Sequence, residues 1–200
     1  MNLVVATANV GKLREFRRML EPLGFEVLGL ADLADRPEIR EDGDTFLDNA
    51  RAKAWPLARS LGGPVLADDS GLVVDALGGA PGVRSARYAG PDATDSDNNR
   101  KLLAELAGVP AERRTAAFVC ALVLAVPGLG EVAAEGRVEG RILDRPRGEG
   151  GFGYDPLFLV GDLERTAAEL DPDTKNRVSH RGRALRLLLP VLRDLGRGAL

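Results

Sequence analysis

The segment TANVGK (Thr7–Lys12) lies where an apolar, β-branched run gives way to a helical pattern of apolar residues. Backbone N–H groups at such a strand-to-helix turn point outward at the positive end of the helix dipole, which suits a phosphate group. Thr7 and Asn9 can add hydrogen bonds, and Lys12 supplies a positive charge. The segment is not a Walker A loop, because Leu13 follows Lys12 where that motif has Ser or Thr. It indicates phosphate binding, with a plain helix N-terminus carrying solvated side chains as the alternative.

Acidic residues form a second group, with Glu41, Asp42 and Asp44 in a polar loop and Asp68 and Asp69 at the end of the apolar run PVLAD. Hard carboxylate oxygens beside a phosphate site indicate Mg²⁺, which binds through a few carboxylates and the phosphates of a substrate. An EF-hand is excluded because its D-x-[DN]-x-[DN]-G spacing is absent. The loop carboxylates could simply be solvated, whereas the apolar flank makes an unpartnered Asp68–Asp69 pair costly.

The two adjacent aspartates are expected to have different surroundings. Successive side chains of a strand point to opposite faces, so a strand through both would not let them serve one metal in the same way. We expect one carboxylate to face the site and the other to be held from behind by Lys53. Lys53 lies four residues after Asn49 on one face of a predicted helix. It could neutralise a carboxylate, contact phosphate, or be an ordinary surface lysine.

The glycine-rich segment GEGGFGYDP is a third candidate. Its glycines match G-x-G-x-x-G, but Pro146 precedes them and a strand follows, so this is not a Rossmann fingerprint. A flexible backbone here could display Phe152, Tyr154 and Asp155, a set of rings and a carboxylate suited to a nucleotide base. The alternative is a loop whose aromatic side chains cap the core.

The segment KNRVSHRG contains the only histidine of the chain, His180, next to Ser179. A serine hydrolase is not indicated, because no G-x-S-x-G elbow exists. Ser179 instead suits the N-cap of a helix that begins at Arg181. His180 and Arg181 would then lie in or beside its first turn, where they could donate to an anion or to a base carbonyl.

Elements that would position these groups follow from apolar periodicity and from capping residues. Thr45 begins a T-x-x-D capping box for the helix 46–61, although Pro56 inside it costs about 3 kcal/mol unless the helix kinks or restarts. Two strands are expected to be joined around Asp69–Ser70. The mixed order of elements and one long hairpin predict an α/β fold with a mixed sheet. Predicted strands are 2–8, 26–30, 64–68, 71–77, 115–126, 131–143 and 157–160, and predicted helices are 12–23, 46–61, 98–106 and 181–195.

Composition sets limits on the class of protein. The 200 residues suggest a single domain, 1–200, with two lobes. The net charge of −3 provides no basic field for a nucleic-acid polymer or an anionic membrane. One histidine and one cysteine argue against structural zinc, and Cys120 lies in an apolar run where a packed thiol is expected. Without a signal peptide or an apolar run of membrane-spanning length, we expect a soluble, cytoplasmic protein.

Taken together, five segments resemble the inosine triphosphate pyrophosphatase family, the non-canonical purine nucleoside triphosphate pyrophosphatases. They occur in the family's order over nearly the whole chain: TANVGKLREF, TFLDNA, ADDSGLVVDALGGAPGVRSARYAG, GGFGYDPLF and SHRGRAL. The resemblance implies an elongated mixed sheet flanked by helices, two lobes with the active site in the cleft between them, and a homodimer. It also implies Mg²⁺-dependent hydrolysis of ITP, dITP and XTP to the monophosphate and pyrophosphate.

The resemblance further implies roles for individual positions. Asp69 would be the general base, Lys53 would assist catalysis, and Glu41 and Asp69 would reach Mg²⁺. Ser70 would contact phosphate, and the rest of the triphosphate would be held by Thr7, Ala8, Asn9, Val10, Gly11 and Lys12. The purine would be surrounded by Phe152, Gly153, Tyr154, Asp155, Lys175, His180 and Arg181. The resemblance also implies which of the two adjacent aspartates faces the site, because it assigns Asp69, rather than Asp68, to the site.

Specificity for deaminated purines has a physical basis in this set. Donors such as Lys175 and Arg181 match the C6 carbonyl of hypoxanthine or xanthine, whereas the amine of adenine would set donor against donor. Two alternatives are a nucleotide-binding module without catalysis and a pyrophosphatase that acts on ordinary nucleotides. The presence of both Asp69 and Glu41 argues against the first alternative.

Overall fold

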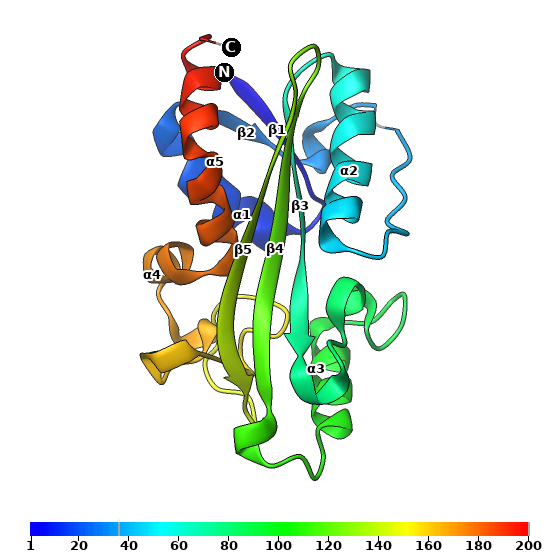
Figure 1. The fold of residues 1–200 in the computed structure, drawn as a ribbon, viewed down its shortest axis with the longest axis vertical. Coiled ribbons are helices and arrows are strands. Elements are labelled where there is room, and N and C mark those ends of the chain that lie inside the picture. The colour runs from blue at the N-terminus through cyan, green and yellow to red at the C-terminus, as the bar shows by residue number, and fades with distance from the viewer. Residues whose placement is uncertain (36, 200) are drawn as a thin grey trace. The chain divides into compact units, whose positions relative to one another are not determined.

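The structure, a computed structural model, describes residues 1–35 and 37–199, so Arg36 of the predicted polar loop lies outside the described residues. Figure 1 shows its elements. The strands are β1 (Asn2–Ala6), β2 (Glu26–Leu28), β3 (Val65–Val74), β4 (Thr115–Val126), β5 (Gly130–Ile142) and β6 (Phe158–Val160). The α-helices are α1 (Val10–Leu20), α2 (Phe46–Leu61), α3 (Asp95–Glu105), α4 (Pro172–Val178) and α5 (His180–Gly196).

Within the described residues the strands form one six-stranded sheet in the order β2-β1-β3-β4-β5-β6. β1 pairs in parallel with both β2 and β3, so that Val4 lies opposite Leu28 on one side and Val65 on the other. β5 and β6 pair in antiparallel fashion. The prediction of an α/β fold with a mixed central sheet flanked by helices is therefore confirmed.

The chain divides into two compact units. Unit 1 consists of Met1–Asp69, Cys120–Gly136 and Arg181–Leu200, and unit 2 consists of Ser70–Val119 and Arg137–His180. β3, β4 and β5 each contribute residues to both units. The boundary in β3 falls directly after the second aspartate of the pair.

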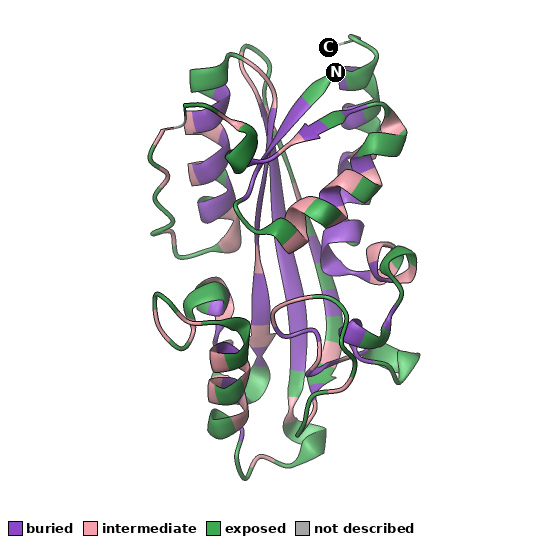
Figure 2. Cartoon of the chain, turned by 180° about the vertical axis from the view of Figure 1, so that it is seen from behind, coloured by how far each residue is buried: buried purple, intermediate pink, exposed green. Residues whose placement is uncertain are grey.

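Helices cover both faces of the strands in unit 1 (Figure 1). α1 and α5 pack on the face that carries Leu3 and Leu66, and α2 packs on the face that carries Val65 and Ala67. The buried stripe of α2 is visible in Figure 2, where one side of the helix is buried and the other is exposed. This arrangement sends alternate residues of β3 toward different helices, which decides the surroundings of the two aspartates.

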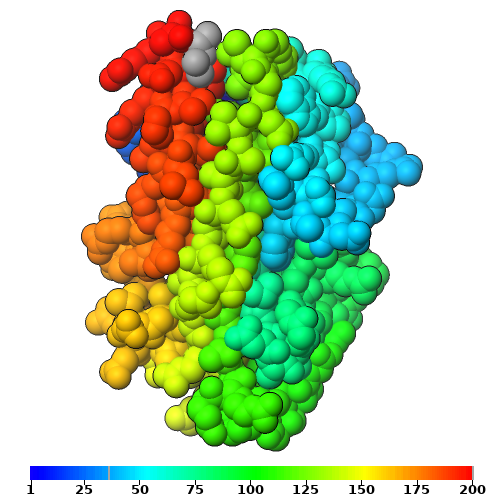
Figure 3. Space-filling model, viewed as in Figure 1, coloured from blue at the N-terminus to red at the C-terminus, as the bar shows by residue number. Residues whose placement is uncertain are grey.

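The core of unit 2 gathers residues from α3, from the four strands β3, β4, β5 and β6, and from the segment before α4. It includes Leu102, Phe118, Tyr154 and Phe158, and the rings of Phe118 and Phe158 lie 4.4 Å apart. β5, in contrast, alternates between buried and exposed residues over part of its length and is mostly exposed elsewhere. Its atoms form a strip of the surface in the view of Figure 3.

The expected break at Asp69–Ser70 is wrong, because β3 continues without interruption from Val65 to Val74. Gly71 is not a turn residue there. A Cβ at Gly71 would clash with Ser85 Oγ and lie 2.6 Å from the carbonyl oxygen of Gly82. The glycine therefore allows a close approach of the segment Gly82–Arg87, a short 3₁₀ helix, to an extended strand.

Several helices also differ from the prediction, and α1 spans Val10–Leu20 while α5 begins at His180. α3 begins at Asp95 rather than at residue 98, because Thr94 and Asp97 form a capping box at its start. α4 was missed, although Asp171 at the N-cap and Pro172 in the first turn are both helix-start signals. α2 covers the predicted residues, with Pro56 inside it and Gly62 (φ 64°) at its end. None of the helices in the described part of the chain is long and apolar enough to cross a membrane.

Candidate active site

The start of α1 is a strand-to-helix turn, as expected from the sequence. Asn9 is the N-cap, and its Oδ1 accepts a hydrogen bond from the backbone N–H of Lys12 at 2.9 Å. Thr7 Oγ1 in turn accepts from the backbone N–H of Asn9 at 3.1 Å. Both side chains therefore shape the turn itself. Ala8, Asn9 and Val10 are exposed, which leaves the N–H end of this eleven-residue helix open to an anion.

Asp68 is completely buried beneath this turn and is surrounded by cationic groups. Its Oδ1 accepts a hydrogen bond from Lys12 Nζ, and its Oδ2 accepts from Arg181 Nε at 3.2 Å and from Cys120 Sγ at 3.1 Å. Burial alone would raise the pKa of Asp68, but the Arg181 guanidinium and the Lys12 ammonium hold it well below its ordinary value. Asp68 is therefore a permanently charged anchor for α1 and α5.

Asp69 has a separate set of partners, and both come from α2. Its Oδ1 accepts from Lys53 Nζ at 2.9 Å, and its Oδ2 accepts from Asn49 Nδ2 at 3.2 Å. Lys53 Nζ also donates to Glu41 Oε2 at 2.8 Å. The amide of Asn49 is fixed in turn, because its Oδ1 accepts from the backbone N–H of Gly43 at 2.9 Å.

The charges of this cluster influence one another. Burial raises the pKa of Asp69 above its ordinary value, although the nearby Lys53 opposes the change. Burial lowers the pKa of Lys53, but the carboxylates of Asp69 and Glu41 outweigh it and raise that pKa. A carboxylate with a raised pKa next to a charged lysine is suited to accept a proton from water.

Strand parity explains which lysine holds which aspartate. Asp69 shares a face of β3 with Val65 and Ala67, which pack against α2, the helix that carries Lys53. Asp68 shares the other face with Leu66, which packs against α1 and α5. The prediction that Lys53 holds Asp68 from behind is therefore wrong, because Lys53 lies on the opposite face of the strand.

The carboxylates of Glu41 and Asp69 are the expected metal ligands. Both accept from the same Lys53 ammonium, so their oxygens approach one point in unit 1. Over residues 1–35 and 37–199, no group of three or more His, Cys, Asp or Glu residues could hold a metal by itself. Two hard carboxylates fit Mg²⁺, which commonly binds one or two protein carboxylates and takes other ligands from substrate phosphates and water.

Unit 2 holds the glycine-rich segment in a defined conformation. Asp155 Oδ2 accepts from the backbone N–H of Phe152 at 2.9 Å and from Lys175 Nζ at 2.6 Å. The Lys175 ammonium lies 4.7 Å from the ring centroid of Phe152, a cation–π arrangement. The expectation of a flexible display is wrong for Tyr154, because its ring is part of the core and its hydroxyl donates to the carbonyl of Ser85 at 2.8 Å.

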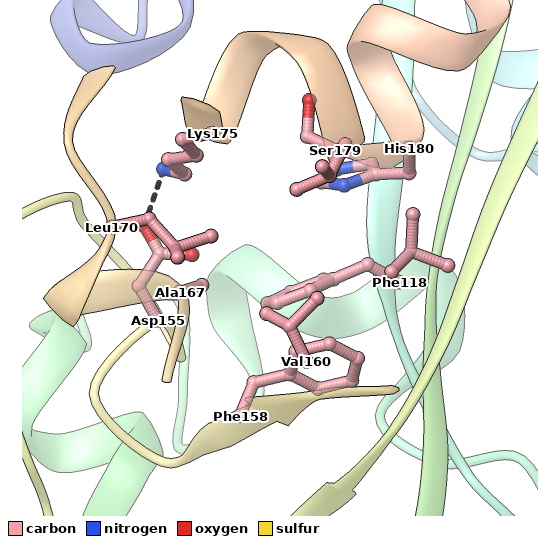
Figure 4. Close-up of a pocket in the computed structure, with 11 residues that line it drawn as sticks. Phe118, Asp155, Phe158, Val160, Ala167, Leu170, Lys175, Ser179 and His180 are labelled. Carbon is pink, nitrogen blue, oxygen red and sulfur yellow. Dashed lines mark hydrogen bonds and ion pairs between the residues drawn. The ribbon is translucent and has the colours of Figure 1, made fainter. Parts of the chain in front are cut away.

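A small cavity of unit 2 adjoins this segment (Figure 4). Its volume is about 20 Å³, which is room for about one water molecule. Lys175 and Asp155 lie on one side, while His180 stacks on Phe118 with ring centroids 4.9 Å apart and planes 16° apart on the other (Figure 4). The cavity is too small to hold a purine, so what this part of unit 2 offers a heterocyclic base is its aromatic and polar side chains rather than the cavity itself.

The family assignment rests on the whole chain. A family model described as the Ham1 family matches residues 3–191. This chain belongs to the Ham1 family. A protein named dITP/XTP pyrophosphatase from Geobacter sulfurreducens is 58% identical over 186 residues, which are 93% of this chain and 94% of that protein. A protein of the same name from Geobacillus kaustophilus is 54% identical over 183 residues, which are 92% of this chain and 90% of that protein.

Solved structures agree with the assignment. The structure of a HAM1 protein from Coxiella burnetii is 43% identical in sequence, with a TM-score of 0.86 over 97% of this chain and 99% of that one. The structure of the Staphylococcus aureus Ham1 protein is 38% identical, with a TM-score of 0.84 over the full length of both chains. The predicted family is therefore confirmed.

In this Ham1-family chain, Arg181 is placed differently from the expectation of a purine contact. It is almost fully buried, its Nη1 donates to Glu15 Oε2, and its Nε donates to Asp68. Burial lowers the pKa of the guanidinium, but Asp68 and Glu15 more than offset that effect and raise it. The structure thus puts Arg181 in the buried charge cluster of unit 1, with Asp68, Lys12 and Glu15.

Sequence reasoning missed two members of that cluster. Glu15 follows Lys12 by three residues on α1, which is the spacing that places both on one face of the helix. Cys120 was expected to be a packed thiol, which it is, but its contact with Asp68 could not be inferred because it joins residues 52 positions apart. Ser70 follows directly in β3 and is partly exposed.

Proposed function

We propose that this chain is a Mg²⁺-dependent pyrophosphatase that hydrolyses the triphosphates of deaminated purines, ITP, dITP and XTP, to the monophosphate and pyrophosphate. The observation that carries the proposal is the cluster of Asp69, Lys53 and Glu41 in a chain 58% identical to a named dITP/XTP pyrophosphatase. Removal of deaminated purines from the nucleotide pool would be its role, and the cytoplasm would be its location.

The triphosphate is bound chiefly at the start of α1 in this proposal. The segment Thr7–Lys12 offers the N–H groups of the first turn of α1, and Ser70 adds a hydroxyl. Lys12 lies beside the same turn with its ammonium held by Asp68. Because Asp68 keeps that ammonium in place before the substrate arrives, less side-chain entropy is lost on binding.

Glu41 and Asp69 would hold Mg²⁺. When bound, the metal would supply charge stabilisation at the phosphate oxygens. Lys53 acts in the same direction, since its ammonium offsets negative charge that develops on the leaving pyrophosphate. Lys53 also keeps Glu41 and Asp69 close together when no substrate is bound.

Asp69 is the general base in this mechanism. Its carboxylate accepts a proton from a water molecule as the water oxygen forms a bond to the α-phosphorus. The bond from the α-phosphorus to the oxygen that bridges to the β-phosphate breaks, and that oxygen leaves with the pyrophosphate. General base assistance of this kind is typically worth about 10²- to 10⁴-fold in rate. No covalent intermediate is required.

The purine is recognised by unit 2 in this proposal, through Phe152–Asp155, Lys175 and His180. The Lys175 ammonium is a donor that matches a C6 carbonyl and opposes the amine of adenine. Arg181 is buried in the charge cluster of unit 1, where its Nη1 and Nε donate to Glu15 and Asp68, so in this proposal Lys175 and His180 carry most of the discrimination. We also propose that the active enzyme is a homodimer, as the family resemblance implies.

Pyrophosphate release with Mg²⁺ from a panel of ITP, dITP, XTP, GTP and ATP tests the proposal. We expect turnover of the first three and much slower turnover of ATP. Binding of ITP without release of pyrophosphate would identify a nucleotide-binding module instead. Equal rates on ATP would show an enzyme for ordinary nucleotides and would remove the proposed role in the nucleotide pool.

A further inference from the structure

Two side chains of α3 hold the backbone of the glycine-rich segment from outside it. Asp95 Oδ2 accepts a hydrogen bond from the backbone N–H of Gly153 at 2.6 Å. Asn99 Nδ2 donates to the backbone carbonyl of Gly153 at 2.9 Å. The two residues are four positions apart on α3, so they lie on one face of the helix and grip both polar groups of a single residue.

Gly153 is the residue of this segment that both contacts from α3 reach. Its φ of +62° lies in the left-handed region, which a glycine adopts with little cost. The two neighbours of Gly153 make other hydrogen bonds. The N–H of Phe152 donates to Asp155, and the hydroxyl of Tyr154 donates to the carbonyl of Ser85. Gly153 has no side chain, so the contacts from α3 hold its own N–H and carbonyl groups, while the Phe152 carbonyl of the preceding peptide accepts from the N–H of Asp155 at 3.2 Å.

The orientation of the Asn99 amide follows from this contact. Its Oδ1 atom is buried and has no hydrogen-bond partner in the described part of the chain. A reversed amide would set that oxygen against the Gly153 carbonyl oxygen, so Nδ2 must face the segment. A buried acceptor without a partner is costly, and its presence indicates that the amide is placed for the bond to Gly153 rather than for its own satisfaction.

The backbone conformation of Gly153 affects the side chains that are proposed to bind the base. Gly153 directly follows Phe152, whose ring lies against the Lys175 ammonium, and it lies two residues before Asp155, which holds that ammonium. A change in the Gly153 peptides would therefore rotate the Phe152 ring and shift Asp155 together. We propose that Asp95 and Asn99 are positioning residues for purine recognition, which act through Gly153. This inference rests on the proposed role of Phe152–Asp155 in binding the purine.

Isosteric substitutions separate the hydrogen bonds from the helix. Asp95→Ala removes the acceptor, whereas Asp95→Asn retains an oxygen that can accept from Gly153 N–H and should recover most of the wild-type KM. Asn99→Asp keeps the shape but removes the donor, and Asn99→Ala serves as a second variant if the added charge prevents folding. Asp97→Ala is the matched control, because Asp97 caps α3 through Thr94 without a bond to the glycine-rich segment.

The measurement is the change in KM and the change in kcat for dITP in each variant. We expect Asp95→Ala, Asn99→Asp and Asn99→Ala each to raise KM about 3- to 10-fold, the effect of one hydrogen bond, with kcat changed less than about twofold. Inhibition by inorganic pyrophosphate should stay at the wild-type value, because that probe lacks the purine. Asp97→Ala should lower the melting temperature and leave KM unchanged.

The outcomes distinguish this inference from the proposed function. If the wild-type protein releases no pyrophosphate from dITP, the proposed function fails before any variant is compared. If the wild type is active but the Asp95 and Asn99 variants keep its KM, the positioning role is wrong. The same conclusion follows if Asp97→Ala raises KM as much as Asp95→Ala, because helix stability would then explain the effect.

Discussion

The Nζ atom of Lys53 lies 2.9 Å from Oδ1 of Asp69, although Asp69 directly follows Asp68, whose side chain is held by Lys12 and Arg181. One strand thus supplies two carboxylates to two different charge clusters in unit 1. Asp68 joins α1 to α5 from the inside. Asp69 is held by Asn49 and Lys53 of α2, and Lys53 also donates to Glu41. The two residues should consequently respond to substitution in different ways.

Asp69→Asn is expected to lower kcat for dITP by about 10²- to 10⁴-fold, because an amide cannot accept the proton of the attacking water. The amide has nearly the same shape, so the variant should remain folded and bind nucleotide. Steady-state pyrophosphate release and calorimetric titration with dITP measure the two properties. Asp42→Asn, which changes an exposed carboxylate of the polar loop, is the control. Near-complete activity of Asp69→Asn would exclude Asp69 as the base.

Lys53→Met is expected to move the acid limb of the pH profile of kcat/KM to higher pH. Lys53 lowers the pKa of Asp69 by its charge and its hydrogen bond, while burial raises it. Without the ammonium, burial raises the pKa of Asp69 further. Asp69 is then protonated at a higher pH, and kcat/KM falls at a higher pH as the solution is acidified. Rates from about pH 4 to pH 9 measure the limb. Lys101→Met, a change on α3 in unit 2, should leave the limb where the wild type has it.

Much of the fold was predictable because its elements are specified locally. The helix Phe46–Leu61 is bounded by a capping threonine and a left-handed glycine, and both signals are visible in the sequence. β3 was divided wrongly, since Ser70 and Gly71 resemble turn residues. Gly71 is in fact required by the approach of Ser85, which comes from a different part of the chain. Long-range packing of this kind leaves no local pattern.

Some features of the candidate site were likewise predictable from the sequence, and others were not. Residue types identified Lys12 and the Asp68–Asp69 pair as functional candidates, because charged groups that adjoin an apolar run need a reason. The choice of Asp69 and the role of Lys175 came from the family resemblance. Partners could not be assigned, since the choice between Asp68 and Asp69 for Lys53 depends on which helix covers which face of β3. The roles of Glu15 and Asn99 were missed because single polar residues on helices give no distinctive signal.

Asp68→Asn is expected to destabilise the protein rather than to remove catalysis alone. Breaking a buried ion pair by removing one partner typically costs about 3–5 kcal/mol, and Asp68 is paired with both Lys12 and Arg181. Urea unfolding at neutral pH should show a lower free energy of unfolding than for wild type. A variant as stable as wild type would contradict the assignment of Asp68 as the anchor of this cluster.

Acidification should affect the same residue in a predictable direction. The folded-state pKa of Asp68 is well below that of an unfolded aspartate, which is about 3.9, so its carboxylate stabilises the fold fully above that value. The contribution is lost as the pH falls below about 4 toward the folded-state pKa. The free energy of unfolding of the wild type should therefore decrease more steeply below pH 4 than that of Asp68→Asn. Equal slopes would mean that Asp68 is not charged in the folded protein.

Cys120 should be chemically inert as long as the fold is intact. Burial and the charge of Asp68 raise the pKa of its thiol well above the ordinary value, and the Sγ atom is held 3.1 Å from Asp68 Oδ2. Because the thiolate is the reactive form, iodoacetamide at pH 8 should fail to alkylate the native protein and should modify it completely in urea. Mass spectrometry after timed exposure measures this difference. Asp68→Asn offers a sharper comparison, since loosening the cluster should expose the thiol more often and speed its alkylation. If the native wild type reacts as fast as the unfolded chain, Cys120 is not packed against Asp68.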